Sequence, residues 1–594
     1  MRRLLHVLRH WLAPPRLAVV YHPRYRITLP GVPSDPARGE HILAFLLDRG
    51  LVRPRDIHRP VPVSLRDVLR VHTPGYLDSL QDPATLTAIF GVPVGDVEAQ
   101  GLLELMRLEA GGTVQATRLA LARGCPAVHL GGGFHHAAPA RGGGFCVIND
   151  IAIAIQRLRA KGFRPNVLVV DLDLHHGNGT RAAFADDVTV HTFSIHNAEW
   201  DDTPAVGSTD VALGSGVTDA AYLSVLRQAL PPVVSAVRPG LVVYLAGADP
   251  AEGDALGDWR ISAAGMVERD RFVVEQVRPA PLAVVLGGGY GFAAWRHSAR
   301  SLSWLAGGRV LEPPDDMELA LRRLRPLARQ LSERALTARG TTDEWSLTEE
   351  DVIGVLSGPP RETRVLGHYS PHGLELLFER AGVLDRLRTL GYPSPALAVD
   401  FGDGVSQTVR VFGEPERQHL LIELRVSRNR RLAPECELVF VEWLLMQNPR
   451  ATFTDANARL PGQQHPGLGM LGLMSAMLVL MAEQTGLDGI ANVPSQYYLA
   501  VVSRHHVRLL DPVAQARFAA LHAVLGHLSL PEAERALAEG RVRDAVTGEV
   551  VRWEPAATVM PVSARLRQRL DGPDYAAAVR AAASRFRFVL DAPA

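Results

Sequence analysis

Acidic and histidine side chains gather where one apolar run of the sequence ends. The run NVLVVDLDL leads directly into HHGNG, so Asp171, Asp173, His175 and His176 follow one another closely. Charged groups on a buried strand are costly unless they are paired or hold a metal. Residues i and i+2 of a strand point to the same face, so Asp173 and His175 can bind one ion together.

Three other apolar runs end in residues of the same chemical kind. AVHL leads into GGGFHH, which contains His135 and His136. LVVYLAGAD ends at Asp249, and LAVVLGGGY ends at Tyr290. Because ligands of open α/β sheets bind outside the carboxyl ends of the strands, we expect all four ends to converge on one site.

The residue types predict a catalytic metal centre. Two carboxylates and one imidazole with an open position are typical of such a centre, and Asp249 would complete a set with Asp173 and His175. Zn²⁺ is expected first, and Fe²⁺ accepts the same ligands. The metal would polarise a carbonyl and activate water, a histidine would move the proton, and Tyr290 would donate to the oxyanion. The predicted reaction is amide hydrolysis without a covalent intermediate.

Elements that position these residues alternate along the first half of the chain. Short Val- and Leu-rich runs are separated by helical patterns, which predicts an α/β fold with a mainly parallel sheet. A chain of 594 residues is expected to form more than one domain. The predicted parts are a basic N-terminal helix (1–15), a catalytic domain (16–312), a helical linker (313–341) and a C-terminal α+β domain (342–594).

Composition excludes some function classes. Lys plus Arg and Asp plus Glu are 63 each, which argues against whole-chain electrostatic binding to nucleic acid or an anionic membrane. The three cysteines form no CxxC pair, and a reducing cytoplasm fits them best. The longest uncharged run, 466–482, is shorter than the ~20 residues of a membrane span and predicts a buried helix.

Four long motifs together resemble the histone deacetylase superfamily. They are HLGGGFHHAAPARGGGFCVINDIAIAI, VVDLDLHHGNGT, AGADPAEGDALGDWRIS and LGGGYGFAAWRHSARSL, within a resemblance that covers about 16–310. GGGFHH, LGDWRIS and GGGY are most similar to class IV and to bacterial acetoin-utilisation and acetylpolyamine amidohydrolase proteins. The resemblance implies a three-layer arginase/deacetylase-like fold. It also implies a zinc-dependent deacylase acting on an acylated lysine of a protein or on a small acylated amine.

The resemblance further implies roles for single residues. Asp173, His175 and Asp249 match the zinc ligands, and His136 matches the general base and acid. His135 matches the electrostatic neighbour of this base, Asp171 and Asn178 match residues that orient the two histidines, and Tyr290 matches the transition-state tyrosine. Phe145 matches a wall of the substrate tunnel, with Gly144 and Gly288 beside the substrate. The carbonyl groups of Asp171, Asp173 and His175, together with Ser194 and Ile195, match a structural K⁺ site.

The sequence departs from the family pattern at two places. AEWDDTPAVG replaces the usual opposite tunnel wall, so Trp200 receives no assignment, and AIFGVPVGDVEAQG contains no identifiable acidic rim residue. Protein-lysine specificity therefore stays open. Arginase-like enzymes need further carboxylates to hold two metal ions. Here His176 and Asn178 follow His175 instead, so we expect a single ion. A non-catalytic acyl-amine binding protein is the other alternative.

The C-terminal half contains one motif with chemical content. Gln464, Gly467 and Gly469 form Q-x-x-G-x-G before a helical pattern, which is similar to the acetyl-CoA pyrophosphate loop of the GCN5-related acetyltransferases. Backbone N–H groups at a helix start suit a phosphate. This resemblance implies an acyl-CoA-dependent N-acyltransferase within a bifunctional protein, and a non-catalytic accessory domain is the alternative.

Overall fold

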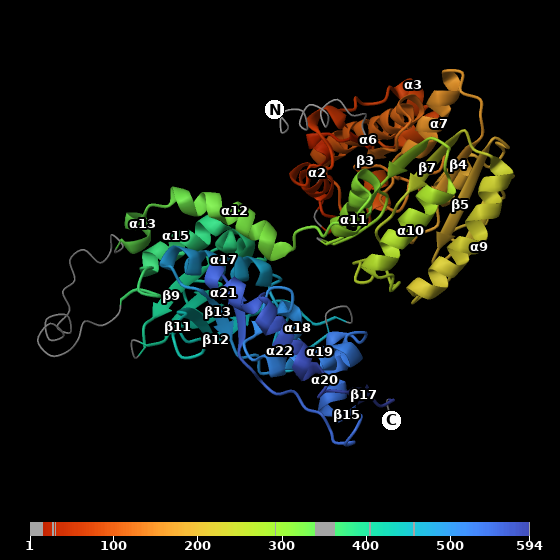
Figure 1. Cartoon of the computed structure of the whole chain (residues 1–594). Helices are drawn as coiled ribbons and strands as arrows, with labels where there is room; N and C mark the ends of the chain where they lie inside the picture. The colour runs from red at the N-terminus through yellow and green to blue at the C-terminus, as the bar shows by residue number, and fades with distance from the viewer. Residues whose placement is uncertain are drawn as a thin grey trace, which may run out of the picture. The chain divides into compact units, whose positions relative to one another are not determined.

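A computed structural model describes residues 16–592 except 27, 28, 30, 292, 339–362, 403, 404 and 455–457. The chain forms two compact units, Met1–Pro313 and Pro314–Ala594, which are described separately below (Figure 1). The predicted N-terminal basic helix over 1–15 lies outside the described residues. Among the residues that are described, no helix has the length and apolar character required to cross a membrane.

The first unit is built on an eight-stranded sheet with the order β2-β1-β3-β8-β7-β4-β5-β6. Every strand pairing described in it is parallel. The four strands whose ends carry the predicted site residues, β3, β8, β7 and β4, are consecutive neighbours. The strands are β1 (Ala18–Val20), β2 (Ile57–His58), β3 (Ala127–His129), β4 (Val167–Asp171), β5 (Val190–His196), β6 (Ser208–Ala212), β7 (Leu241–Leu245) and β8 (Leu282–Val285).

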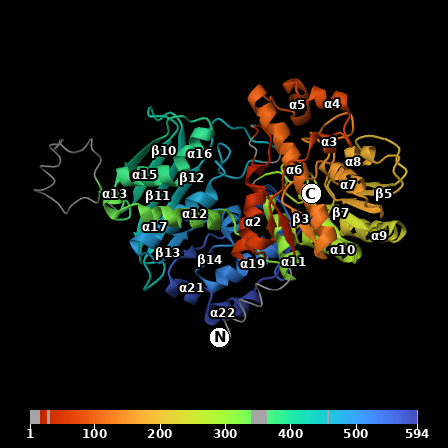
Figure 2. The ribbon, with the colours of Figure 1, turned by 90° about the horizontal axis from the view of Figure 1, so that it is seen from above.

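Helices form a layer on each face of this sheet, as the two views show (Figures 1 and 2). One layer contains α9, α10, α11 and α2 in contact with one another, and the other contains α6 and α7. The helices of the unit are α2 (Arg38–Asp48), α3 (Leu65–Val68), α4 (Pro74–Ser79), α5 (Pro83–Phe90), α6 (Asp96–Arg123), α7 (Asp150–Ala160), α8 (Asn178–Ala183), α9 (Asp219–Val237), α10 (Ala263–Gln276) and α11 (Trp295–Gly307).

Burial on both faces explains why the strand sequences are continuously apolar. All residues of β4, β7 and β8 are buried, as expected for parallel strands covered by helices on both sides. The predicted α/β fold with a mainly parallel sheet is confirmed. One boundary differs, because β4 ends at Asp171 rather than running on to Leu174. The backbone turns there because Asp171 Oδ1 accepts from the N–H of Asp173, and Asp173 Oδ1 accepts from the N–H of His175.

The second unit contains a seven-stranded mixed sheet with the order β14-β16-β13-β12-β11-β10-β9. Only the β12–β13 pairing is parallel among its described strands. The strands are β9 (Ala396–Asp400), β10 (Gln407–Phe412), β11 (Leu420–Asn429), β12 (Leu438–Met446), β13 (Gly489–Asn492), β14 (Arg508–Leu509) and β16 (Thr558–Pro561), with β15 (Val542–Asp544) and β17 (Phe588–Leu590) forming a separate pair.

Helix α17 connects the two parallel strands of this sheet. Its buried side chains confirm the expectation of a buried helix in 466–482, but the helix spans Leu471–Thr485 and so begins five residues later. The helices of the unit are α12 (Asp316–Gln330), α13 (Glu333–Thr337), α15 (Pro371–Ala381), α16 (Val383–Thr389), α17 (Leu471–Thr485), α18 (Tyr497–Ser503), α19 (Pro512–Leu525), α20 (Leu530–Ala538), α21 (Ala564–Leu570) and α22 (Pro573–Ala583).

The described residues 314–338 of the segment expected to be a linker are part of the second unit. Met317, Leu321 and Leu324 of α12 belong to the same buried cluster as Met474 and Met477 of α17. The apolar face of α12 therefore packs into this core, so the description of 313–341 as a linker needs correction.

A fully buried arginine forms hydrogen bonds to the backbone just after β4 and β7. Arg269 of α10 donates through Nη1 to the carbonyl oxygens of Leu172 (3.0 Å) and Gly247 (2.7 Å). Its Nε donates to Asp270 Oδ1 at 2.8 Å. One guanidinium thus fixes the backbone beside Asp173 and shortly before Asp249.

We expect Arg269→Met to lower the free energy of unfolding of the first unit by about 3–5 kcal/mol, because the buried Asp270 would lose the cation that pairs with it. Urea unfolding followed by circular dichroism measures the loss. The exposed pair of Arg227 with Glu268 provides the control. Arg227→Met should cost at most about 1 kcal/mol. Equal losses in the two variants would contradict the supporting role.

Candidate active site

The ends of the four neighbouring strands surround one cavity of about 230 Å³. The residues that line it include His135 and His136 from the loop after β3, Asp173 from the turn after β4, and Tyr290 from the loop after β8. Asp249, from the loop after β7, lies beside them and is in contact with His175. The convergence that the sequence predicts is therefore present in the fold.

Asp173, His175 and Asp249 bring their ligand atoms together. His175 Nδ1 lies 3.2 Å from Asp173 Oδ1 and 3.0 Å from Asp249 Oδ2. All three ligand atoms lie within 4.8 Å of one another. Ligand atoms at zinc distances in a tetrahedral site are separated by about 3.3 Å, so this arrangement fits such an ion.

Burial favours a cation or a proton between the carboxylates of Asp173 and Asp249. Asp173 is 1% and Asp249 0% exposed. Burial, together with the negative charge of Asp173, raises the pKa of Asp249. Backbone N–H groups hold the outer oxygens, since Gly288 donates to Asp173 Oδ2 at 2.6 Å and Leu174 donates to Asp249 Oδ1 at 3.1 Å. The donor set therefore suits a divalent metal with fixed carboxylates.

A glycine is required where the loop after β8 passes these ligands. A Cβ atom on Gly288 would lie 2.4 Å from Asp249 Oδ2 and 2.7 Å from Asp173 Oδ2. A side chain would push both carboxylates out of place. Gly288 thus permits the close approach of backbone that the sequence suggests.

His135 is held as a cation. Its Nδ1 donates to Asp171 Oδ2 at 2.7 Å, and both side chains are buried. Burial alone would lower the pKa of His135, but the carboxylates of Asp171 and Asp173 outweigh it and raise the pKa to about 9.

His136 is neutral, and its tautomer follows from its neighbours. Asn178 Nδ2 donates to Asp201 Oδ2 at 2.9 Å, which turns Asn178 Oδ1 towards His136. His136 Nδ1, 3.0 Å away, therefore carries the ring proton and donates it, leaving a lone pair on Nε2. Burial lowers the pKa of His136 well below its usual value, and the positive charge of His135 lowers it further. Two adjacent imidazoles thus have pKa values driven apart.

Tyr290 and Phe145 lie together at the cavity wall, with ring centroids 5.8 Å apart. Burial and the nearby carboxylates of Asp173 and Asp249 raise the pKa of Tyr290 well above its usual value, so its hydroxyl keeps its proton. Phe145 and Gly144 have positive φ angles of 65° and 51°. A Cβ on Gly144 would lie 2.3 Å from His136 Cδ2, so this turn packs on the histidine ring.

Sequence reasoning missed the segment after β5. The indole of Trp200 stacks on His136 with centroids 4.0 Å apart and an interplanar angle of 4°. Asp201 orients Asn178, as described above. The only sequence signal was an aromatic residue in a segment that departs from the family pattern. Ser194 Oγ forms a hydrogen bond with His196 Nδ1, and the K⁺ site expected from Ser194, Ile195 and neighbouring carbonyls stays a prediction.

Gln464, Gly467 and Gly469 lie in the loop that leads to α17 in the second unit. Gly469 has a φ of +67°, a conformation that favours glycine. A Cβ on Gly467 would meet only the Met446 carbonyl oxygen, at 3.8 Å. The loop is therefore open on the side of Gly467.

Comparisons with known proteins agree on one family for the first unit. A family model described as "Histone deacetylase domain" matches residues 32–305. An uncharacterized protein of Picosynechococcus sp. is 36% identical over 276 residues, which cover 46% of this chain and 91% of that protein. Histone deacetylase 2 of Arabidopsis thaliana is 35% identical over 310 residues, covering 49% of this chain and 79% of that protein.

One solved structure is similar to part of the chain. The crystal structure of the HDA15 HD domain has a TM-score of 0.42 and 24% sequence identity, and the match covers 50% of this chain and 92% of that one. The extent of the sequence matches to the two relatives above shows the family. The chain belongs to the histone deacetylase family, and it is an amidohydrolase.

Proposed function

We propose that the first unit is a zinc-dependent deacylase that hydrolyses the amide of an acyl-lysine or of a small acylated amine. Asp173, His175 and Asp249 would hold the metal. His136 would act as base and acid, and Tyr290 would donate to the oxyanion. The observation that carries the proposal is a buried three-ligand set beside two adjacent histidines, one hydrogen-bonded to a carboxylate and the other to an amide.

The metal and the histidines divide the chemistry. Zinc, when bound, polarises the substrate carbonyl and lowers the pKa of water. His136 accepts the proton of the attacking water at Nε2, because Nδ1 already donates to Asn178. The same nitrogen then gives a proton to the leaving amine. Fe²⁺ would suit the same ligands.

His135 and Tyr290 stabilise negative charge as it develops. His135 remains an imidazolium because Asp171 accepts its Nδ1 proton and the charge of Asp173 favours the cation, so it contributes positive charge without moving a proton. Tyr290 keeps its hydroxyl proton and can donate it as a hydrogen bond to the carbonyl oxygen. In a cavity lined by Phe145, such fixed charges act in a lower dielectric than that of water.

We propose a second activity for the second unit, the binding of an acyl-CoA. The specific observation is the position of the Q-x-x-G-x-G loop, which follows the β12 strand of the sheet's parallel pair and precedes α17. The N-cap residue of α17, Met470, forms no capping hydrogen bond with its side chain, and backbone N–H groups at a helix start suit a pyrophosphate. Gln464, Gly467 and Gly469 would line this site.

Substitution of Tyr290 and His136 tests the deacylase proposal. On a panel of acetyl- to long-chain acyl-lysines and acetylated polyamines, we expect Tyr290→Phe to lower kcat by about 10²–10³-fold. For His136→Ala we expect a loss of about 10²–10⁴-fold. Zinc content and circular dichroism should stay at wild-type levels. Tyr575→Phe, whose hydroxyl only donates to Leu509 O in the second unit, is the control. Turnover that survives both active-site changes would contradict the proposal.

The charge of His135 predicts the alkaline limb of the pH profile. His135 is protonated below about pH 9 and loses its charge as the pH rises through that value, so kcat/KM should fall there. Asp171→Asn removes a carboxylate that raises the pKa of His135 and should move the limb to lower pH. Stopped assays between pH 6 and roughly 10.5 measure this shift. An unchanged limb in Asp171→Asn would show that His135 does not set it.

Calorimetry with acetyl-CoA tests the second activity. We expect the wild-type protein to bind and Gly467→Trp to lose binding, because the open side of the loop would be filled. Gln568→Trp adds the same indole to an exposed position of α21 and should bind like the wild type. Absence of binding by the wild type, or equal binding by Gly467→Trp, would refute the acyl-CoA site.

A further inference from the structure

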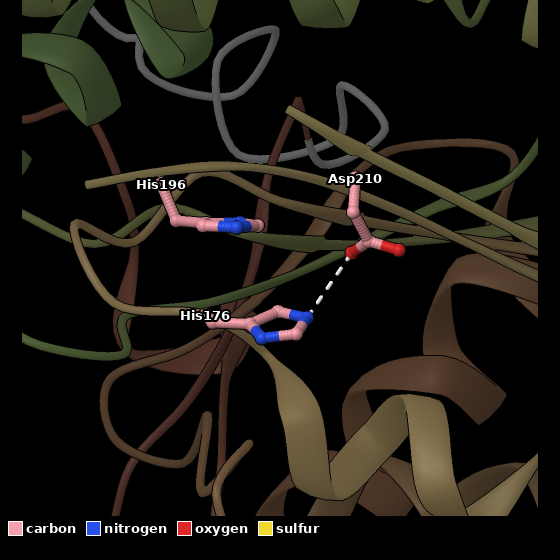
Figure 3. Close-up of side chains that lie close together, drawn as sticks. All are labelled: His176, His196 and Asp210. Carbon is pink, nitrogen blue, oxygen red and sulfur yellow. Dashed lines mark ion pairs between the residues drawn. The ribbon is translucent and has the colours of Figure 1, made fainter. Parts of the chain in front are cut away.

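His176, the second histidine of the pair at the end of β4, faces away from the metal ligands. Its fully buried ring stacks on His196 of β5, with centroids 4.4 Å apart and an interplanar angle of 23°. Its Nε2 lies 3.3 Å from Asp210 Oδ1 on β6. Figure 3 shows this carboxylate at the edge of the His176 ring, with His196 above it. The site proposed above uses none of these three residues.

The tautomer of His176 is fixed by a backbone group. The N–H of Trp200 donates to His176 Nδ1 at 3.2 Å, so Nδ1 is an acceptor and the proton of the neutral ring is on Nε2. That proton is on the side of Asp210, whose negative charge favours it there. The carboxylate therefore keeps Nδ1 free to accept the Trp200 N–H.

Asp210 is itself anchored as an anion. Ser208 donates to its Oδ2, and Arg181 Nη1 lies 3.6 Å from the same oxygen. Burial alone would raise the pKa of Asp210, but its contacts with His176, Ser208 and Arg181 lower it. The charge that orients His176 is thus held from two sides.

These three side chains do not suit a second metal ion, although their ligand atoms lie within 4.8 Å of one another. A metal on His176 Nε2 would require the ring proton on Nδ1. That proton would point at the N–H of Trp200, and two donors would then face each other. The contacts of this cluster instead lead towards the active site.

Trp200 connects this cluster to the catalytic base. Its indole covers one face of His136 and meets the edge of His175, with centroids 5.7 Å apart. The next residue, Asp201, accepts from Asn178 Nδ2 and so sets the amide that holds His136 Nδ1. Trp200 thus packs on the face of the His136 ring, and Asp201 holds its Nδ1 edge through Asn178.

We propose that Asp210 and His176 are positioning residues that hold Trp200 against the catalytic His136. The inference rests on the proposed deacylase function. Asp210 selects the tautomer of His176, His176 accepts the backbone N–H of Trp200, and the indole keeps the His136 ring in the orientation in which Nε2 serves as base. Loss of the carboxylate acts on the reaction only through Trp200.

A double-mutant cycle tests whether the effect passes through Trp200. We expect Asp210→Ala and Trp200→Ala each to lower kcat by about ten- to a hundredfold, as partners that orient a catalytic group do. Asp210→Ala should have no further effect in the Trp200→Ala background. Asp210→Asn keeps the shape and an acceptor oxygen, so it should lose less than Asp210→Ala. Asp187→Asn is the control, because Asp187 only holds the turn at Thr189.

Hydrogen exchange gives a readout that does not depend on activity. In Asp210→Ala, the peptide covering 197–206 should exchange its amides faster, because the Trp200 N–H loses a fixed acceptor. Asp187→Asn should leave that peptide unchanged. If the wild type exchanges slowly and Asp210→Ala exchanges fast while no acyl substrate is turned over, the deacylase proposal fails and the positioning contact stands.

Two outcomes of the activity and metal measurements would overturn the positioning proposal. One is equal loss of kcat from Asp210→Ala in the wild-type and Trp200→Ala backgrounds, which would show a route that bypasses the indole. The other is a second equivalent of zinc, found by elemental analysis of the wild type and absent from Asp210→Ala. Unchanged exchange over 197–206 in Asp210→Ala would likewise contradict it.

Discussion

Two buried carboxylates at the ends of adjacent strands are the constraint on which the first unit depends. Asp173 and Asp249 are almost completely buried and lie against the same histidine nitrogen. Like charges this close in a low dielectric are unfavourable unless a cation or a proton lies between them. The neighbouring parallel strands β4 and β7 nevertheless direct both into one point, because their carboxyl ends share an edge of the sheet.

The residues around Asp173 and Asp249 hold the two carboxylates close together through fixed hydrogen bonds rather than through contact with solvent. Arg269 donates to a backbone oxygen after each of the two strands and so holds the segments that carry the carboxylates side by side. Gly288 brings a backbone N–H to Asp173 where any side chain would collide with both acids. The same field of negative charge explains the two histidines. His135 contacts Asp171 and keeps its proton, whereas His136 contacts a neutral amide and loses it.

Much of this could be predicted from the sequence because it depends on local patterns. Buried parallel strands read as apolar runs, and polar residues at their ends mark the ligand edge, which was enough to select Asp173, His175, Asp249 and Tyr290. The order β3-β8-β7-β4 could not be read from the sequence, because pairing between distant strands leaves no local signal. Helix α12 shows an apolar face, but that face does not reveal which core it joins. Its assignment as a linker was wrong for this reason.

The segment after β5 was missed for a different reason, which the pair His175–His176 makes clear. Adjacent histidines in a turn diverge, so that one ring meets Asp173 and Asp249 while the next meets Asp210 and the N–H of Trp200. A sequence shows the pair but not what the second ring contacts, because Asp210 comes from β6 and Trp200 from an irregular loop. The turn after β4 therefore contributes both to the metal site and to the position of the catalytic base. It presents a ligand on one side, and on the other it binds the loop that covers the base, so the positions of ligand and base depend on each other.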